Sequence, residues 1–308
     1  MAEPRFILHH YESSPYAEKI RLLFGRGQQS WGSVLSPAMP PRPNVDPLTG
    51  GYRRIPIAQV GADIFCDTAI IAQEIALQSP ISGLSADSVP NEVAELVQRA
   101  EGDVFFSAIT SVKPLKLMGT MLTLFGPFGM MRFIKDRRQM MKGGSVRPPQ
   151  GERAVAIFDG FLADLDKALT SRAFLSGDEP AYADFAVYHP IWLKARVGGG
   201  AISKQYPHVR RWFDRIPEVG HGAREELQTV HAFAEARANE PRPLPASEEG
   251  AELLNCQVTV APEDYGREPV QGLLVAQTSE RFIVARETGE FGVLHVHFPR
   301  QGYVVVKV

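Results

Sequence analysis

The amino-terminal part of the chain opens with a short apolar run followed by an amphipathic pattern. Residues 5–8 (RFIL) are apolar after the first arginine and predict a strand. In residues 14–24 (SPYAEKIRLLF), apolar side chains recur at three- and four-residue spacing, which predicts a helix with one buried face. Ser14 suits the N-cap of this helix, and Pro15 suits its first turn. The chain therefore begins with a strand, a tight turn and a helix.

The next pattern completes a compact α/β unit. Residues 36–54 are dense in proline and glycine and indicate an irregular loop. A strand beginning with Ile55-Pro56 (IPIAQVG) follows, then a second strand (ADIFCDT) and a helix (AIIAQEIAL). The pattern predicts a first domain over residues 1–88.

Two further regions differ from each other in the spacing of their apolar positions. Between residues 89 and 240 the apolar positions keep helical spacing and are interrupted by Pro and Gly, which predicts an all-α bundle domain. Residues 239–250 (NEPRPLPASEEG) are typical of a linker. Over residues 247–308 the period changes to two, in five short runs separated by turn residues. We expect a small β-barrel or sandwich module there.

Composition removes several function classes. The 308 residues carry 33 Lys+Arg and 35 Asp+Glu, a net charge of −2, so the total gives no electrostatic sign of nucleic-acid binding. Two cysteines, Cys66 and Cys256, are too few for a disulfide scaffold, and no Cys/His cluster suggests a metal site. We expect a reducing, cytoplasmic compartment. Cys66 lies in a predicted strand and is interpreted as a buried thiol.

A charge-free run over residues 117–131 (LMGTMLTLFGPFGMM) raises the question of a membrane. It is shorter than the about 20 residues that a spanning helix needs, and Gly and Pro interrupt it. We therefore expect no transmembrane segment. The run and the methionines in it suit a pocket for an irregular apolar ligand, with ordinary core or dimer contact as the alternative.

Three short features suggest chemistry. Ser14 stands where a strand passes into a helix, and the free N–H groups of a helix N-terminus favour an anion such as a thiolate. Ile55-Pro56 is a candidate cis peptide at a strand start, and Asp67-Thr68 lies between a strand and a helix. Each feature alone has an ordinary structural explanation as a cap or a strand start. Their occurrence in this order within one small α/β unit favours a binding site.

These motifs resemble a known family. SPYAEKIRLLF, RIPIAQVG and FCDTAIIAQEI resemble the thioredoxin-like N-terminal domain of the glutathione transferases, and FLSGDEPAYADFAVYHPI resembles the folding signature of their helical domain. The resemblance covers residues 5–235 and implies a thioredoxin-like domain followed by the helical transferase domain. The carboxyl-terminal β module is additional. It would cover the substrate cleft, add a subunit contact or recruit a partner.

The resemblance implies roles for individual residues. Ser14 matches the residue that contacts the glutathione sulfur in serine-type members, although neighbouring Ser13 leaves the identity of this hydroxyl open. Ile55 matches the residue whose backbone pairs with the cysteinyl part of glutathione, before the cis-proline Pro56. Asp67 and Thr68 match the pair that holds the γ-glutamyl end. Arg54 lies where many members have a basic residue.

The sequence also departs from the family pattern. Asp67-Thr68 replaces the more frequent Glu-Ser, and Ala181 stands where the capping box before Asp184 usually has Ser or Thr. The four residues that begin with Ser14 contain no sulfur, so thioredoxin-type disulfide exchange is excluded.

The function implied by the resemblance is that of a glutathione transferase. Glutathione would be the co-substrate, its thiol would attack a small hydrophobic electrophile, and the enzyme would be a cytoplasmic homodimer without a metal. The alternative is a non-catalytic glutathione-binding or protein-interaction module on the same scaffold.

Overall fold

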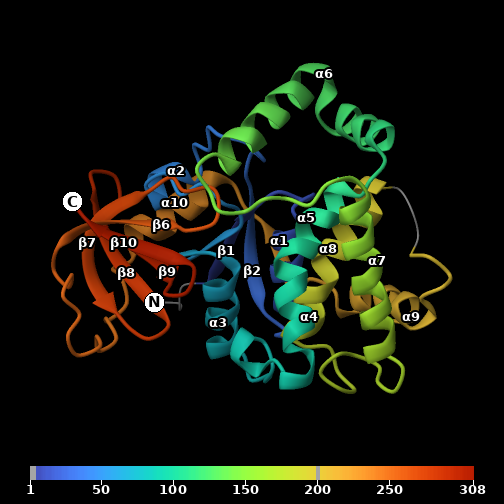
Figure 1. Cartoon of the computed structure of the whole chain (residues 1–308). Helices are drawn as coiled ribbons and strands as arrows, with labels where there is room; N and C mark the ends of the chain where they lie inside the picture. The colour runs from blue at the N-terminus through green and yellow to red at the C-terminus, as the bar shows by residue number, and fades with distance from the viewer. Residues whose placement is uncertain (1–4, 199–201) are drawn as a thin grey trace.

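The computed structural model describes residues 5–198 and 202–308. Residues 1–4 of the expected first domain and 199–201 of the expected second lie outside it. In Figure 1 the helices gather on one side of a central sheet and the carboxyl-terminal strands lie on the other. A kinked helix arches over the region between these two sides.

The first unit has the thioredoxin-like order that the sequence predicts. Strand β1 pairs in parallel with β2 and antiparallel with β3, which pairs antiparallel with β4. The elements are β1 (Phe6–His10), α1 (Pro15–Arg26), β2 (Ser30–Leu35), α2 (Asp46–Thr49), β3 (Ile57–Val60), β4 (Asp63–Cys66) and α3 (Thr68–Gln78).

The second unit is helical. Its elements are η1 (Ala86–Ser88), α4 (Asn91–Glu101), α5 (Asp103–Thr110), α6 (Pro114–Met141), α7 (Gly151–Ala168), α8 (Tyr182–Gly198), α9 (Pro207–Arg215) and η2 (Ile216–Val219). Apolar side chains of α4, α5, α7, α8 and α9 share one core with α1, α3 and the sheet. Burial of this common core packs α1 against α8.

The last part of the expected helical domain returns to the sheet. Strand β5 (Ala223–Glu226) pairs in parallel with β2, and α10 (Thr229–Ala238) follows it. Ala232 of α10 packs with Ile7 and Val34, and its carbonyl accepts a hydrogen bond from Gln59 Nε2 at 2.8 Å. The helical domain thus ends before residue 240, and α10 covers the sheet face opposite to α1.

The carboxyl-terminal strands differ from the expected separate module. They are β6 (Gln257–Pro262), β7 (Val270–Gln277), β8 (Arg281–Thr288), β9 (Gly292–Pro299) and β10 (Tyr303–Lys307). Strand β9 pairs in parallel with β4, so that one ten-stranded sheet runs β10-β6-β7-β8-β9-β4-β3-β1-β2-β5. Ile57, Ile64 and Cys66 share a core with these strands. The strands therefore extend the first sheet in place of an independent barrel or sandwich.

A buried carboxylate on β4 links the first part of this sheet to the carboxyl-terminal strands through hydrogen bonds. Asp63 on β4 accepts a hydrogen bond from His297 Nε2 on β9 at 2.7 Å and another from the Arg242 amide at 2.9 Å. Burial raises the pKa of Asp63, but the hydrogen bonds and charges of His297 and Arg242 lower it overall. The carboxylate therefore stays ionised and keeps both bonds at neutral pH.

Helix α6 forms the arch. Its 28 residues are interrupted by a non-helical backbone at Gly126 (φ 66°), next to Pro127, so it consists of two arms over residues 114–125 and 127–141. It is the one helix among the described residues that is long and apolar enough to cross a membrane by length and composition. Each arm alone is shorter than the about 20 residues that a span requires.

Acid should destabilise the protein through β1. His9 and His10 are fully buried, and burial lowers the pKa of His9 from 6.5 to about 4, while burial and Arg21 lower that of His10 to about 3. Below pH 6.5 these histidines bind protons in the unfolded chain but not in the folded chain. The free energy of unfolding therefore decreases as the pH is lowered. We expect His10→Gln to reduce this slope by up to about 1.4 kcal/mol per pH unit, a limit approached near pH 5, measured by urea unfolding between about pH 7 and pH 5. An unchanged slope would exclude His10 as a source of the acid sensitivity.

Candidate functional site

Ser14 holds the start of α1. It is the N-cap, and its Oγ accepts the Ala17 amide at 3.2 Å, while Pro15 occupies the first turn. The side chain is buried, with an exposed fraction of 1%. The local pattern predicted this capping geometry, because an N-cap hydroxyl satisfies one of the unpaired amides of the first turn.

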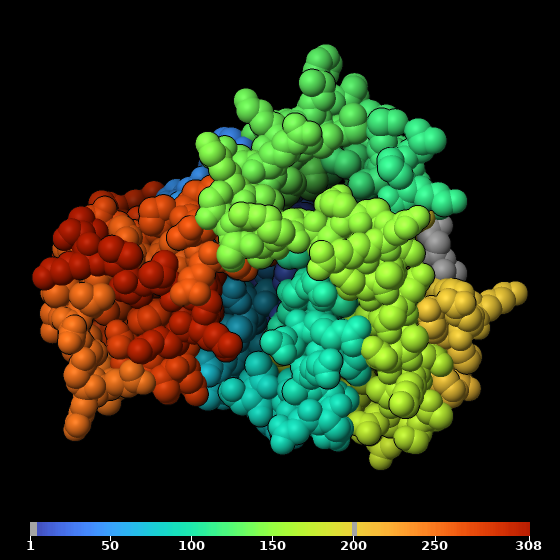
Figure 2. Space-filling model, in the orientation of Figure 1, coloured from blue at the N-terminus to red at the C-terminus, as the bar shows by residue number. Residues whose placement is uncertain are grey.

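A cavity of about 1180 Å³ lies beside this helix N-terminus. Figure 2 shows the hollow beneath the arch of α6, between the sheet and the helices. The sequence-predicted site residues that line it are Ser13, Arg54, Ile55, Pro56, Asp67 and Thr68. Ser14 does not line this cavity. The structure thus brings together six of the seven predicted residues and leaves Ser14 behind them.

Ile55 lies at the inner edge of the sheet. The Ile55–Pro56 peptide bond is cis, and the first residue of β3 that pairs with β1 is Ile57. The backbone N–H and C=O of Ile55 are therefore not used by strand pairing. They remain available to an extended ligand at the cavity wall.

Asp67 and Thr68 stand at the N-terminus of α3. Asp67 is the N-cap with a positive φ of 95°, and its Oδ1 accepts the Ala69 amide at 3.0 Å. Its Oδ2 accepts the hydroxyl of Tyr303 at 3.0 Å. One carboxylate thus caps the helix and also faces the cavity, where it lies beside the unpaired donors of the helix end.

The carboxyl-terminal region supplies part of this wall. Arg54 forms an ion pair with Asp264, donates to the carbonyl oxygen of Tyr265 at 2.6 Å, and lies over the Tyr265 ring at 4.2 Å. It also lies 3.8 Å from Asp67. The loop between β6 and β7 therefore borders the cleft. Of the three roles left open for the β region, these contacts match that of covering the cleft.

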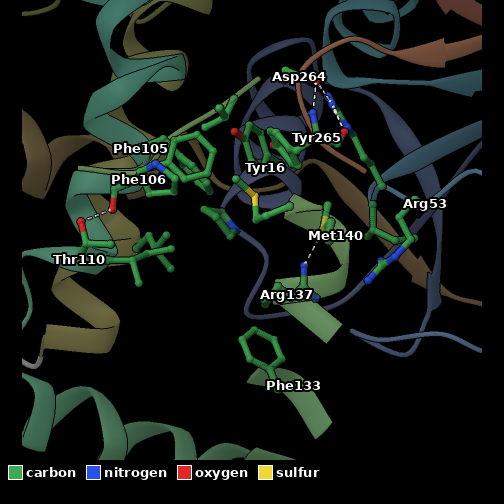
Figure 3. Close-up of a pocket in the computed structure, with 18 of the residues that line it drawn as sticks. Tyr16, Arg53, Phe105, Phe106, Thr110, Phe133, Arg137, Met140, Asp264 and Tyr265 are labelled. Carbon is green, nitrogen blue, oxygen red and sulfur yellow. Dashed lines mark hydrogen bonds and ion pairs between the residues drawn. The ribbon is translucent and has the colours of Figure 1, made fainter. Parts of the chain in front are cut away.

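Two tyrosine side chains, Tyr16 and Tyr265, line the cavity. Figure 3 shows Tyr16 of α1 beside Tyr265, with Phe105 and Phe106 of α5 facing them. Burial, together with Tyr265, raises the pKa of Tyr16 well above its usual value. Tyr16 is therefore a neutral hydrogen-bond donor at physiological pH. Sequence reasoning missed Tyr265, because residues 16 and 265 are joined only by the sheet extension.

The opposite wall of the cavity is apolar. Side chains from α5 and from the inner face of α6 form it: Phe105, Phe106, Ile109, Leu117, Met121, Leu124, Phe125 and Phe133. The expectation that residues 117–131 line a pocket is met on one face of the arch. Met131 points elsewhere, because 68% of its surface is exposed.

The charges around the cavity favour an anion. Of the residues that the structure describes, seven cationic side chains line it (Arg42, Arg53, Arg54, Arg137, Arg138, Lys142 and Arg147), against four acidic ones (Asp67, Glu101, Asp103 and Asp264). The lining therefore carries a net charge of 7 − 4 = +3. Partly apolar walls strengthen this field by excluding water.

Other candidate groups lie away from the cavity. Cys66 is fully buried, and burial raises the pKa of its thiol well above the usual value, so it is a poor nucleophile. Among the described residues, no group of three or more His, Cys, Asp or Glu could hold a metal ion.

Asp184 supports the helical side of the site. It is fully buried, and its carboxylate accepts three hydrogen bonds, from the amides of Leu175 and Ala181 and from Trp212 Nε1. The carboxylate half of the capping box is therefore present, although Ala181 lacks the hydroxyl of the other half.

Comparison with known proteins agrees with this architecture. Residues 148–215 match the model of the glutathione S-transferase C-terminal domain. A solved GST-like protein from Pseudomonas syringae is 30% identical, with 99% of this chain and all of that chain covered and a TM-score of 0.75. Its similarity therefore includes the carboxyl-terminal strands.

Two more distant solved structures cover about two thirds of this chain. A glutathione S-transferase domain-containing protein from Marinobacter aquaeolei is 14% identical over 68% of this chain and 97% of its own, with a TM-score of 0.50. A glutathione S-transferase from Methylobacterium radiotolerans, solved with glutathione sulfonate, is 18% identical over 69% of this chain and 90% of its own, with a TM-score of 0.46. No curated protein matches the sequence. On the identity and coverage of the Pseudomonas syringae protein, this chain belongs to the glutathione S-transferase family.

Proposed function

We propose that the chain is a glutathione transferase that conjugates glutathione to a small apolar electrophile. The observation that carries the proposal is the single cavity that joins Ser13, Ile55 and Asp67 on one wall to an apolar surface on the other. A polar tripeptide and an apolar partner can lie next to each other in such a space. This arrangement reduces the loss of orientational freedom on reaching the transition state.

Glutathione would lie along the sheet side of this cavity. Its γ-glutamyl ammonium would pair with the Asp67 carboxylate, and its carboxylate would meet the Thr68 hydroxyl and the amides at the start of α3. The cysteinyl backbone would pair with Ile55. The excess of cations in the lining suits a peptide that carries two carboxylates and one ammonium.

The sulfur would then reach the N-terminus of α1. Ser13 faces the cavity there, whereas Ser14 is buried behind it, so we assign the hydrogen bond to sulfur to Ser13. A donor to a charged sulfur stabilises the thiolate by about 1.5–3 kcal/mol, and the helix N-terminus adds about 0.3–1 kcal/mol. The thiol proton passes to solvent, and the thiolate forms a carbon–sulfur bond with the electrophilic carbon. An aryl halide then releases its halide ion, and Ser13 acts as a donor throughout.

The two serines give a matched test. We expect Ser13→Ala to lower kcat/KM for conjugation of an aryl halide roughly tenfold, because the thiolate loses one charge-assisted hydrogen bond. Ser14→Ala should instead lower the free energy of unfolding by about 1 kcal/mol through loss of the N-cap, with turnover close to wild type. Steady-state kinetics and urea unfolding of both variants measure the two effects.

The reverse result would change the assignment. If Ser14→Ala abolishes turnover in a folded enzyme and Ser13→Ala does not, the sulfur contact belongs to Ser14. If neither variant affects turnover, the hydroxyls at this turn take no part in the reaction.

A second function has one specific observation in its favour. Asp264, Tyr265 and Tyr303 already engage Arg54 and Asp67, as they would in a site that binds without turnover. This alternative predicts heat on calorimetric titration with glutathione but no conjugate with any of a panel of aryl halides. A cytoplasmic location and a homodimer remain predictions of the family resemblance.

A further inference from the structure

The outer face of α6 carries apolar side chains that nothing in the described structure covers. Phe128 and Met131 have exposed fractions of 87% and 68%, and they lie just after the kink at Gly126. Figure 2 shows the arch protruding from the rest of the molecule. Apolar surface concentrated on a protruding element marks a contact site for an apolar partner.

Cations follow this apolar segment along the same face. Lys135 and Arg138 stand seven and ten residues after Phe128, a spacing that keeps all three on one side of a helix, and both are exposed. Arg138 also lines the inner cavity, so it lies at the border between the two faces of the arm. Within residues 5–198 and 202–308, neither Lys135 nor Arg138 forms an ion pair with a carboxylate. They border a shallow groove lined by Met131, Arg132, Ile134, Lys135, Arg138, Gln139 and Lys142.

The segment has the composition of a helix that lies on a lipid surface, with apolar side chains followed by cations. At the rise of an α-helix, Lys135 lies about 10 Å and Arg138 about 15 Å from Phe128 along the axis. Interfacial segments bury their apolar side chains about 5–10 Å into the boundary between headgroups and acyl chains. With the arm along the surface and Phe128 and Met131 at that depth, the long side chains of Lys135 and Arg138 would reach the phosphates.

We propose that the outer face of the second arm of α6 docks on an anionic lipid bilayer. A second copy of the chain fits this surface less well, because the second arm offers Lys135 and Arg138 no carboxylate: Asp136, its one acidic residue, already pairs with Arg53 and Arg137. The proposal does not depend on the transferase activity, since membrane binding requires no turnover. It accounts for an apolar tip and an unpaired basic flank on one exposed helix.

Flotation with lipid vesicles tests the proposal. The full chain should float with vesicles of phosphatidylcholine and phosphatidylglycerol and remain unbound with pure phosphatidylcholine. Phe128→Asp with Met131→Asp should abolish flotation. Leu77→Asp is the matched control, because Leu77 of α3 is 72% exposed on another surface. This variant should float with the vesicles as the wild type does.

A second pair of variants isolates the charge. Lys135→Glu with Arg138→Glu should weaken partition at least tenfold, because each cation near an anionic leaflet contributes about a factor of five to binding. Arg153→Glu with Lys167→Glu, two exposed positions on α7, changes the net charge equally and should leave flotation intact. Circular dichroism verifies that all variants are folded.

Three results would overturn the proposal. The first is equal flotation with pure phosphatidylcholine, and the second is flotation that survives Phe128→Asp with Met131→Asp. The third is a concentration-dependent dimer that this double variant dissociates while no vesicle binding is seen, which would assign the surface to a second copy.

Discussion

Asp67→Asn is expected to weaken glutathione binding about 30-fold or more. The variant removes the carboxylate that would pair with the γ-glutamyl ammonium, and truncating one partner of a buried charge pair costs about 2–5 kcal/mol. Asparagine is as good an N-cap as aspartate and is tolerated at positive φ, so the start of α3 should keep its φ of 95°. Calorimetric titration with glutathione measures the change.

A neighbouring carboxylate gives the control for Asp67. Asp103 also lines the cavity, on the helical side, and Asp103→Asn removes the same charge without touching α3. Its dissociation constant should stay close to that of wild type. Equal weakening by both variants would mean that the general field of the cavity, and not a contact at α3, controls binding.

Asp184→Ala should cause the largest loss of stability, about 3–5 kcal/mol, because a buried donor left without a partner costs about 1–3 kcal/mol. The three donors are the amides of Leu175 and Ala181 and Trp212 Nε1, at 2.8, 3.1 and 2.8 Å. They join α8 to α9 and to the preceding loop. Urea unfolding measures the loss.

Two further variants serve as comparisons for the stability loss of Asp184→Ala. Asp184→Asn keeps the Oδ1 position, which receives both Leu175 and Trp212, and should therefore cost less than alanine. Asp178→Ala, at an exposed position in the same loop, should change stability by no more than about 0.5 kcal/mol. If alanine at 184 proves as mild as alanine at 178, the capping carboxylate is dispensable.

Local features of the site were predictable from the sequence. The N-cap at Ser14, the proline in the first turn of α1 and the aspartate before α3 each depend on residues a few positions apart. Capping preferences arise within one helical turn, so a single sequence contains the information. The same short-range pattern marked residues 117–131 as an apolar run suited to a pocket or to core or dimer contact, and left the choice between them open.

Long-range features were not predictable. The pattern of residues does not predict that β9 pairs with β4, because an unpaired strand edge accepts any strand with a compatible pattern. Tyr265 and Tyr303 reach Arg54 and Asp67 only through that pairing. Likewise, adjacent Ser13 and Ser14 differ in exposure because of the direction of the turn, which composition and spacing do not determine.

The ultraviolet absorbance of the thiolate of bound glutathione, recorded as a function of pH, tests the central claim most directly. A free thiol has a pKa of about 8.5. With sulfur at the α1 N-terminus, the midpoint should fall by about one to three units, and Ser13→Ala should return it most of the way. Saturating glutathione that titrates as it does in water would contradict a thiol-activating site at this turn.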